Sequence, residues 1–270
     1  HDRVNYDDAK WMVPDTRKKI SKFQKDVLEV ELQEAVDNGT IEEIYWVGGE
    51  PLMYDIHWRI MQQLVDSGKS KDVVIRYNTN LSRVIYKNYS LYDLLPHFKK
   101  VNVCASIDGV GTVGEYIRTG LKWNQWIDNF KQGHFLIDQY GDDALVFDVT
   151  LTTPGLFDLK NMFDCVTELG VKSYFKITFA FDPSVVMSPL CLPKDILEET
   201  VNELLEYMEP RITPKTQVYI DTLKNLLTRP TFYESYPDAE QGIKQGKRNI
   251  EFLESIRDCD VTFRSVLNDR

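Results

Sequence analysis

A glycine pair followed by a carboxylate is the first feature of this 270-residue sequence that suggests chemistry. Gly48, Gly49, Glu50 and Pro51 follow an apolar run that is typical of a buried strand. Two glycines let a backbone approach a ligand closely, and a carboxylate at that place suits an ammonium group. The alternative is a plain tight turn whose glutamate is solvated.

A second glycine pattern, from Gly109 to Gly114, reads GxGxxG and lies between a candidate strand and a candidate helix. That order is typical of the dinucleotide-binding fingerprint, which also requires an acidic residue about 20 positions later, at the end of the next strand. Asp128 falls inside a candidate helix and Asp148 in the middle of a candidate strand. The dinucleotide interpretation therefore fits poorly.

Cysteine and histidine spacing excludes the common metal motifs. The four cysteines are Cys104, Cys165, Cys191 and Cys259, and no two of them form a CxxC pair. The sequence also lacks the HExxH, GxSxG and Walker A motifs. We expect no metal or iron–sulfur site formed within this sequence, and we expect Cys104 and Cys165 to be buried, reduced thiols.

Composition narrows the function classes further. Apolar residues make up 43% of the sequence, which is enough for a large core, and the net charge is −10. This acidity disfavours a nucleic-acid partner. No apolar run approaches the roughly 20 residues that span a bilayer, so we expect no membrane partner.

Alternating strand and helix patterns dominate the first two thirds of the sequence. They predict five strands, over 41–47, 72–77, 101–107, 145–152 and 173–181, with helices between them and one helix before the first, ending at Gly39. Beyond Pro183 only helices are predicted, over 193–208, 216–227 and 241–256. We expect an α/β core over residues 1–183 and a helical C-terminal segment over residues 184–270.

Four of these strands alternate apolar and polar residues. The polar positions are Arg76, Asn78 and Asn80, then Asn102, Cys104, Ser106 and Asp108, then Asp148, Thr150 and Thr152, and finally Lys176 and Thr178. Each strand therefore offers one polar and one apolar face. A doubly wound sheet would be apolar on both faces, and a closed barrel fills its interior with aliphatic side chains. The pattern favours an open or partial barrel with a polar interior; strands with one solvated face are the alternative.

Three strings in a fixed order resemble the radical S-adenosylmethionine (SAM) enzymes. They run from Ile44 to Leu52 (IYWVGGEPL), from Tyr77 to Asn80 (YNTN), and from Ser106 to Gly109 (SIDG) with Glu115 to Arg118 (EYIR). The resemblance covers roughly residues 28–182 and is greatest to the twitch-domain proteins, relatives of the SPASM-domain group. It implies a partial (β/α)6 barrel with a polar lumen.

The same resemblance implies roles for individual residues. Glu50 matches the GGE glutamate that holds the SAM amino group, and Arg118 matches an arginine that can pair with the SAM carboxylate. The other positions that match the cofactor site of the family are Gly48, Gly49, Pro51, Asn78, Asn80, Ser106 and Asp108.

One departure from the family is large. Radical SAM enzymes carry a CxxxCxxC motif after the first barrel strand, whose three thiolates hold a [4Fe–4S] cluster, and this sequence has no such motif. We expect the first strand and its cysteine loop upstream of His1. A natural member of the family that has lost its cluster is the alternative.

The resemblance implies an enzyme that generates a 5′-deoxyadenosyl radical for hydrogen abstraction, with a flavodoxin or ferredoxin as electron donor and a cytoplasmic location. As given, without the cysteines, the chain is expected to be inactive. By analogy the substrate is a peptide or protein. Tyr219, Phe232, Tyr233 and Tyr236 could line a groove for it, or they could simply pack the C-terminal segment on the barrel. A binding or structural protein without a cluster, and a barrel enzyme with non-radical chemistry, remain alternatives.

Overall fold

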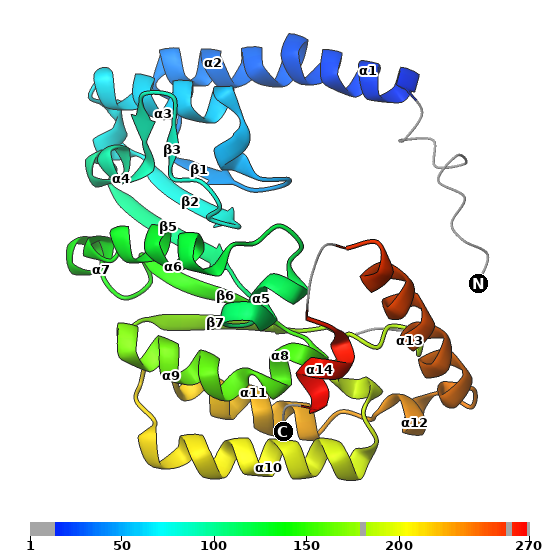
Figure 1. Ribbon diagram of the computed structural model, residues 1–270. Coiled ribbons are helices and arrows are strands. Elements are labelled where there is room, and N and C mark those ends of the chain that lie inside the picture. Colours follow the sequence, from blue (N-terminus) through cyan, green and yellow to red (C-terminus); the bar gives the residue numbers. More distant parts are fainter. Residues whose placement is uncertain (1–13, 179–181, 258–260, 269–270) are drawn as a thin grey trace.

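A parallel sheet of five strands forms the centre of the structure, a computed structural model that describes residues 14–178, 182–257 and 261–268 (Figure 1). The strands are β1 (Glu43–Trp46), β2 (Val74–Thr79), β5 (Lys100–Ser106), β6 (Leu145–Leu151) and β7 (Lys172–Ile177). They lie in the order β1-β2-β5-β6-β7, and all neighbours are parallel. The predicted α/β class and the five predicted strands are confirmed, although the end of the last, 179–181, lies outside the described residues.

The order of the strands in the sheet is their order in the sequence, so each connection moves one strand further in the same direction. The connecting helices are α3 (Asp55–Asp66) and α4 (Leu91–Leu94), then α5 (Gly111–Ile117), α6 (Trp123–Gln132) and α7 (Phe135–Tyr140), then α8 (Thr153–Phe157) and α9 (Leu159–Leu169). Right-handed crossovers in one direction place helices on one face of a sheet. A dinucleotide-binding sheet instead reverses direction at its centre, so the described sheet is not of that kind.

The face of the sheet that these helices cover is apolar. Tyr77, Val103 and Phe147 are fully buried and belong to one core with the helix residues Trp126 and Phe130. The rings of Trp126 and Phe130 meet that of Phe147 edge-on, at centroid distances of 5.1 and 4.7 Å. This burial of apolar and aromatic area stabilises the packing of the helices on the sheet.

The opposite face of the sheet is polar. Side chains from all five strands line one cavity there, among them Tyr45, Asn78, Asn102, Asp148 and Lys176. The predicted division into an apolar and a polar face is therefore confirmed, and the polar face encloses space.

A small antiparallel hairpin, which the sequence pattern does not predict, follows β2. Its strands are β3 (Ile85–Tyr86) and β4 (Tyr89–Ser90). The rings of Tyr86 and Tyr89 stack on Trp58 of α3, at centroid distances of 5.9 and 6.3 Å. The hairpin thus covers α3 through aromatic contacts.

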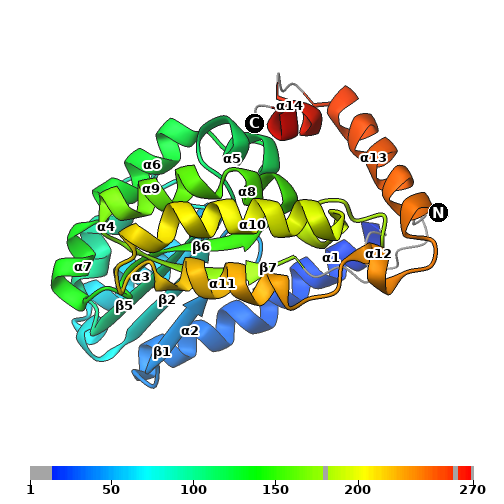
Figure 2. The same cartoon turned by 90° about the horizontal axis from the view of Figure 1, so that it is seen from below.

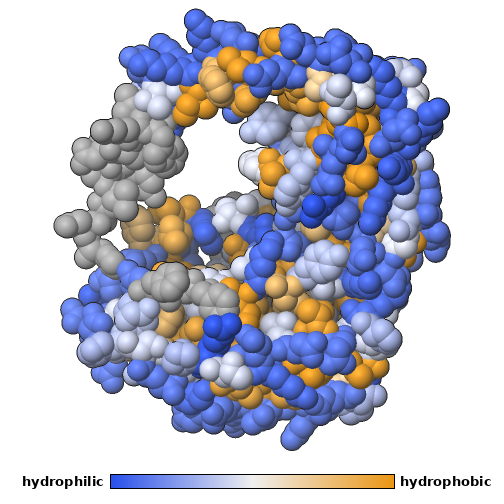
Figure 3. All heavy atoms as spheres, turned by 180° about the vertical axis from the view of Figure 1, so that it is seen from behind, coloured by the Kyte–Doolittle hydropathy of each residue, from blue (hydrophilic) through white to orange (hydrophobic). Residues whose placement is uncertain are grey.

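A long helical rod precedes β1. It consists of α1 (Pro14–Phe23), the π-helical turn η2 (Gln24–Leu28) and α2 (Glu29–Asn38), and it ends at Gly39, whose φ of +67° is left-handed. The predicted helix before the first strand is therefore confirmed. Figure 3 shows apolar residues on the side of this rod that faces a wide opening in the molecule. Its exposed apolar side chains are Ile20, Phe23, Leu28 and Val30.

The C-terminal segment is helical, as predicted, with α10 (Lys194–Met208), α11 (Gln217–Leu227), α12 (Phe232–Ser235), α13 (Ala239–Ser255) and α14 (Phe263–Asn268). Figure 2, which views the molecule from below, shows α10 and α11 side by side in front of the sheet, and α13 extending away from it. Tyr219 and Phe232 are fully buried in the common core, so these two aromatic residues pack the segment against the α/β core and line no groove. Among the described residues, no helix has the length and apolar character needed to cross a membrane.

Candidate functional site

The turn after β1 has the backbone geometry that its glycines predict. Gly48 and Gly49 have φ angles of +85° and +53°, which other residues rarely adopt. A side chain on Gly49 would also meet the Tyr54 hydroxyl at 3.0 Å. Pro51 is buried and begins the 3₁₀ turn η3 (Pro51–Met53). Backbone conformation alone therefore accounts for both glycines.

Glu50 already has several partners in the protein. One carboxylate oxygen accepts hydrogen bonds from the Leu52 N–H at 3.1 Å and from the Thr79 hydroxyl at 2.6 Å. The other oxygen accepts from the Asn80 N–H at 2.7 Å. Glu50 thus ties the end of β1 to the end of β2. It is not the solvated glutamate of a plain turn, and one of the roughly four lone-pair positions of its carboxylate stays open.

The two predicted asparagines lie in different surroundings. The Asn80 side-chain oxygen accepts from the Ser82 N–H at 3.0 Å, and its amide nitrogen has no partner in the described part of the chain. Asn78 instead accepts from the Tyr45 hydroxyl at 2.6 Å and donates to Asp148 at 3.0 Å. Asn80 therefore belongs with Glu50 at the strand ends, whereas Asn78 belongs to the cavity on the polar face.

Asp108 connects the next pair of strands. Its Oδ1 accepts from the Thr150 N–H at 2.8 Å, and its Oδ2 lies 2.7 Å from Nε of Arg118. This second contact is an ion pair rather than an aligned hydrogen bond. Asp108 is buried, whereas the Arg118 side chain is 30% exposed. The two terminal guanidinium nitrogens of Arg118 have no partner among residues 14–178, 182–257 and 261–268, so they can donate to a ligand.

Ser106 ends β5, opposite Asp148 in the register of β6. It is partly buried, and no hydrogen bond of its hydroxyl is found within the described ranges. Ser106, Asn80 and Arg118 are therefore three predicted residues with free polar groups. Asn80 and Ser106 lie at the ends of the neighbouring strands β2 and β5, and Arg118 follows α5 and is tied to the end of β5 through Asp108.

The GxGxxG loop has a packing role. A side chain on Gly114 would lie 2.3 Å from the Gly109 carbonyl oxygen, so the helix α5 can approach its own loop only with glycine there. The buried carboxylate of Asp158 accepts a hydrogen bond from the Val110 N–H at 2.6 Å. Asp158 lies between α8 and α9, and this hydrogen bond fixes the GxGxxG loop in place. Sequence reasoning missed Asp158, because its position in a helix start carries no motif.

The C-terminal segment reaches the Arg118 turn. The Tyr116 hydroxyl donates to Glu254 of α13 at 2.7 Å, and Arg257 donates to the Tyr116 carbonyl at 3.4 Å. Because Tyr116 lies two residues before Arg118, these contacts hold the turn from which Arg118 projects. No spacing in the sequence predicts this link across 138 residues.

Three of the four cysteines lie in the described part of the chain, far apart in the sequence. Cys104 and Cys191 are buried as free thiols, and burial raises the pKa of Cys104 to about 11, with the nearby Asp148 charge adding to the effect. The expectation of burial is only partly correct for Cys165, which lies at the half-exposed side of α9. Cys259 lies outside the described residues. Within the described ranges no group of three or more His, Cys, Asp or Glu side chains could hold a metal ion.

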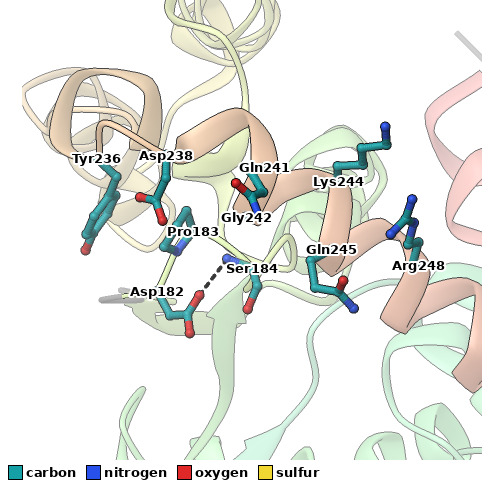
Figure 4. A pocket seen from close by; sticks show the side chains of 10 residues that line it. All are labelled: Asp182, Pro183, Ser184, Tyr236, Asp238, Gln241, Gly242, Lys244, Gln245 and Arg248. Carbon is teal, nitrogen blue, oxygen red and sulfur yellow. Dashed lines mark hydrogen bonds between the residues drawn. The ribbon is translucent and has the colours of Figure 1, made fainter. Parts of the chain in front are cut away.

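A larger cavity, of about 710 Å³, lies apart from the residues that match the cofactor site of the family, but Tyr236, one of the aromatic residues predicted for a groove, lines it. It is formed by the loop after β7, with Asp182 and Ser184, and by Gln241 and Gln245 of α13 (Figure 4). Figure 4 shows the Lys244 side chain pointing away from Asp182. The walls carry no side chain that is nine-tenths buried, and the cavity is a gap between the helix and the loop rather than a site built around a polar group.

The candidate site thus consists of two hydrogen-bonded groups of residues, one at the ends of β1 and β2 and one at the ends of β5 and β6. Both face the carboxyl edge of a parallel sheet, where such folds bind ligands. Comparisons of the chain with protein-family models and with curated proteins find no match.

Proposed function

We propose that this chain is the SAM-binding core of a radical SAM enzyme, with a partial (β/α)6 barrel, a twitch-like C-terminal segment and a peptide or protein substrate in the cytoplasm. The observation that carries the proposal is the set of free polar groups at adjacent strand ends and on Arg118, which Asp108 ties to them. Arg118 offers unpaired donors for a carboxylate, Asn80 and Ser106 offer neutral partners for a ribose, and Glu50 retains an open position for an ammonium.

The residues present fit SAM better than they fit the iron–sulfur cluster. The free groups match the charged and neutral parts of SAM in type. The described residues hold no group of three cysteines, so they do not fit a [4Fe–4S] cluster, and that cluster has to be held by residues outside the described ones. In the family, SAM supplies hydrogen abstraction through a 5′-deoxyadenosyl radical. The residues of this chain would bind and orient it and exclude water.

Calorimetric titration with S-adenosylhomocysteine tests the proposal without requiring a cluster. Arg118→Met should weaken binding about tenfold or more, because it removes charge-assisted hydrogen bonds worth roughly 1.5–3 kcal/mol. Arg59→Met, on the outer side of α3, is the matched control and should leave the affinity unchanged. Equal affinities in the two variants would contradict the proposal. If both bind but genomic codons upstream of His1 lack CxxxCxxC, the alternative of a binding protein without a cluster is favoured.

A further inference from the structure

The cavity on the polar face of the sheet is a second candidate binding site. It has a volume of about 510 Å³ and lies nearer to the strand beginnings than the residues assigned to SAM. All five strands contribute to its walls, from Tyr45 on β1 to Tyr174 and Lys176 on β7. It adjoins the candidate SAM site, because Asp148 in the cavity lies two residues before Thr150, whose N–H binds Asp108.

Asp148 is the central polar group of this cavity. Its side chain is only 7% exposed. One carboxylate oxygen, Oδ2, accepts from Asn78 at 3.0 Å and from Lys176 Nζ at 2.8 Å, and Asn78 is itself oriented by the Tyr45 hydroxyl. The other oxygen, Oδ1, has no partner among the described residues and is not closed off from the cavity. A buried acceptor with fixed geometry is therefore presented to a ligand.

The charges around the cavity balance. The acids Glu43, Asp143 and Asp148 face the bases Arg76, Lys100 and Lys176. Glu43 pairs with Arg76 at 3.3 Å, and Asp148 with Lys176 at 2.8 Å. Because the fixed charges cancel, the cavity has no net attraction for an ion. It favours an uncharged ligand that donates to Asp148 Oδ1 and accepts from the remaining N–H groups of Lys176, whose side chain is 60% exposed.

We infer that this cavity binds the extended main chain of a peptide, with a peptide N–H donating to Asp148 and a peptide carbonyl accepting from Lys176. From β1 to β7 the cavity crosses four interstrand spacings of about 4.8 Å, or roughly 19 Å. About six extended residues span that length, at 3.3 Å each. A peptide repeats its donor and acceptor along this path, and the cavity offers it one acceptor, Asp148 Oδ1, beside one donor, Lys176. The inference deepens the proposed function by naming how its substrate is held, but the binding step needs neither SAM nor iron.

Nuclear magnetic resonance titration of the full chain with an uncharged probe, acetyl-Gly-Ser-Gly-Ser-Gly-amide, tests this inference. We expect saturable shifts of the Asn78 and Asn102 side-chain amides. Lys176→Met should weaken binding about tenfold, the loss expected for a hydrogen bond from a charged donor. Lys172→Met is a matched control on the same strand and face: it removes an ion pair with Asp143 but does not line the cavity, so it should leave the affinity unchanged.

Several outcomes would overturn the inference: no saturable binding, an equal loss in Lys172→Met, or displacement of the peptide by maltotriose or inorganic phosphate at equal concentration. Circular dichroism of the two variants checks that both fold. We expect Lys176→Met to fold because the Lys176 side chain is 60% exposed. Peptide binding without S-adenosylhomocysteine binding would contradict the proposed function and leave this inference standing. The reverse result would contradict this inference alone.

Discussion

Glu50 and Asp108 are two carboxylates that follow strands of the same sheet, and the fold uses them differently. Glu50 accepts three hydrogen bonds from uncharged groups and closes the gap between β1 and β2. Asp108 is more deeply buried and divides its oxygens between a backbone N–H of β6 and the charged Arg118. Glu50 links the ends of two strands, whereas Asp108 also positions the cationic side chain of Arg118.

This difference shows which predicted residues can serve a ligand. A carboxylate whose lone pairs are taken by the protein has little capacity left, however well its motif matches. Arg118 keeps its terminal nitrogens free because Asp108 contacts only its Nε. The cation held by Asp108, rather than either carboxylate, is therefore the strongest candidate for direct contact with a charged ligand.

Replacing Asp108 should cause the largest loss of stability. Asp108→Ala leaves the Thr150 N–H without its acceptor and Arg118 without its counter-ion, so it should lower the free energy of unfolding by about 3 kcal/mol. Urea denaturation measures this loss. Asp128→Ala, at an exposed position of α6, is the control and should change stability by less than about 0.5 kcal/mol. A similar small change for Asp108 would contradict the ion-pair geometry.

Lowering the pH should reduce the stability of the region around β1 and β2, because this region contains the buried His57. This histidine is buried between Trp46 and Tyr77, and burial lowers its pKa from 6.5 to about 3. Below pH 6.5 the unfolded chain binds a proton at this site that the folded chain does not bind, so stability falls as the pH is lowered toward 3. The loss between pH 6.5 and pH 5 should be about 1.6 kcal/mol.

Urea denaturation over this pH range checks the assignment. His57→Gln should flatten the pH dependence, whereas His97→Gln, at an exposed site, should leave it unchanged. An unchanged slope in His57→Gln would show that other groups cause the acid sensitivity.

Glu50→Gln has the next largest expected effect. A Gln side chain keeps one acceptor oxygen, but its NH₂ group would face N–H or O–H donors that now bind the second oxygen. The free energy of unfolding should fall by about 1.5 kcal/mol. Glu42→Gln, an exposed residue just before β1, is the matched control. If the two variants are equally stable, Glu50 does not tie β1 to β2.

Much of the fold follows from sequence periodicity, and much of the site does not. Strand parity correctly placed Asn78, Asp148 and Lys176 on one polar face, because period two is a local property of a strand. Thr79 lies between Asn78 and Asn80 and therefore on the opposite, apolar face, yet its buried hydroxyl is a partner of Glu50.

Residues that act across long separations were not predictable from the sequence. Glu254 reaches Tyr116 because the C-terminal end of α13 lies beside α5, and no local pattern encodes that contact. The motif match identified Glu50 and Arg118 as candidate ligand-binding residues, but it could not show that Glu50 already has three partners in the protein and that Arg118 keeps its terminal nitrogens free.

The smallest expected effects come from removing one serine hydroxyl, and they distinguish a hydroxyl that has a partner from one that has none. Ser106 has no hydrogen-bond partner among the described residues, whereas the buried hydroxyl of Ser173 lies 3.1 Å from that of Tyr219. Ser173→Ala should therefore lower the free energy of unfolding by about 1 kcal/mol, and Ser106→Ala by less than about 0.5 kcal/mol.

If Ser106 contacts SAM, Ser106→Ala should weaken S-adenosylhomocysteine binding about threefold, the equivalent of one neutral hydrogen bond, while Ser173→Ala leaves binding unchanged. Equal stability losses in the two variants would mean that Ser106 has a structural partner. An unchanged affinity in Ser106→Ala would remove this serine from the proposed site and leave Arg118 as its main determinant, because the Arg118 test does not depend on the hydroxyl.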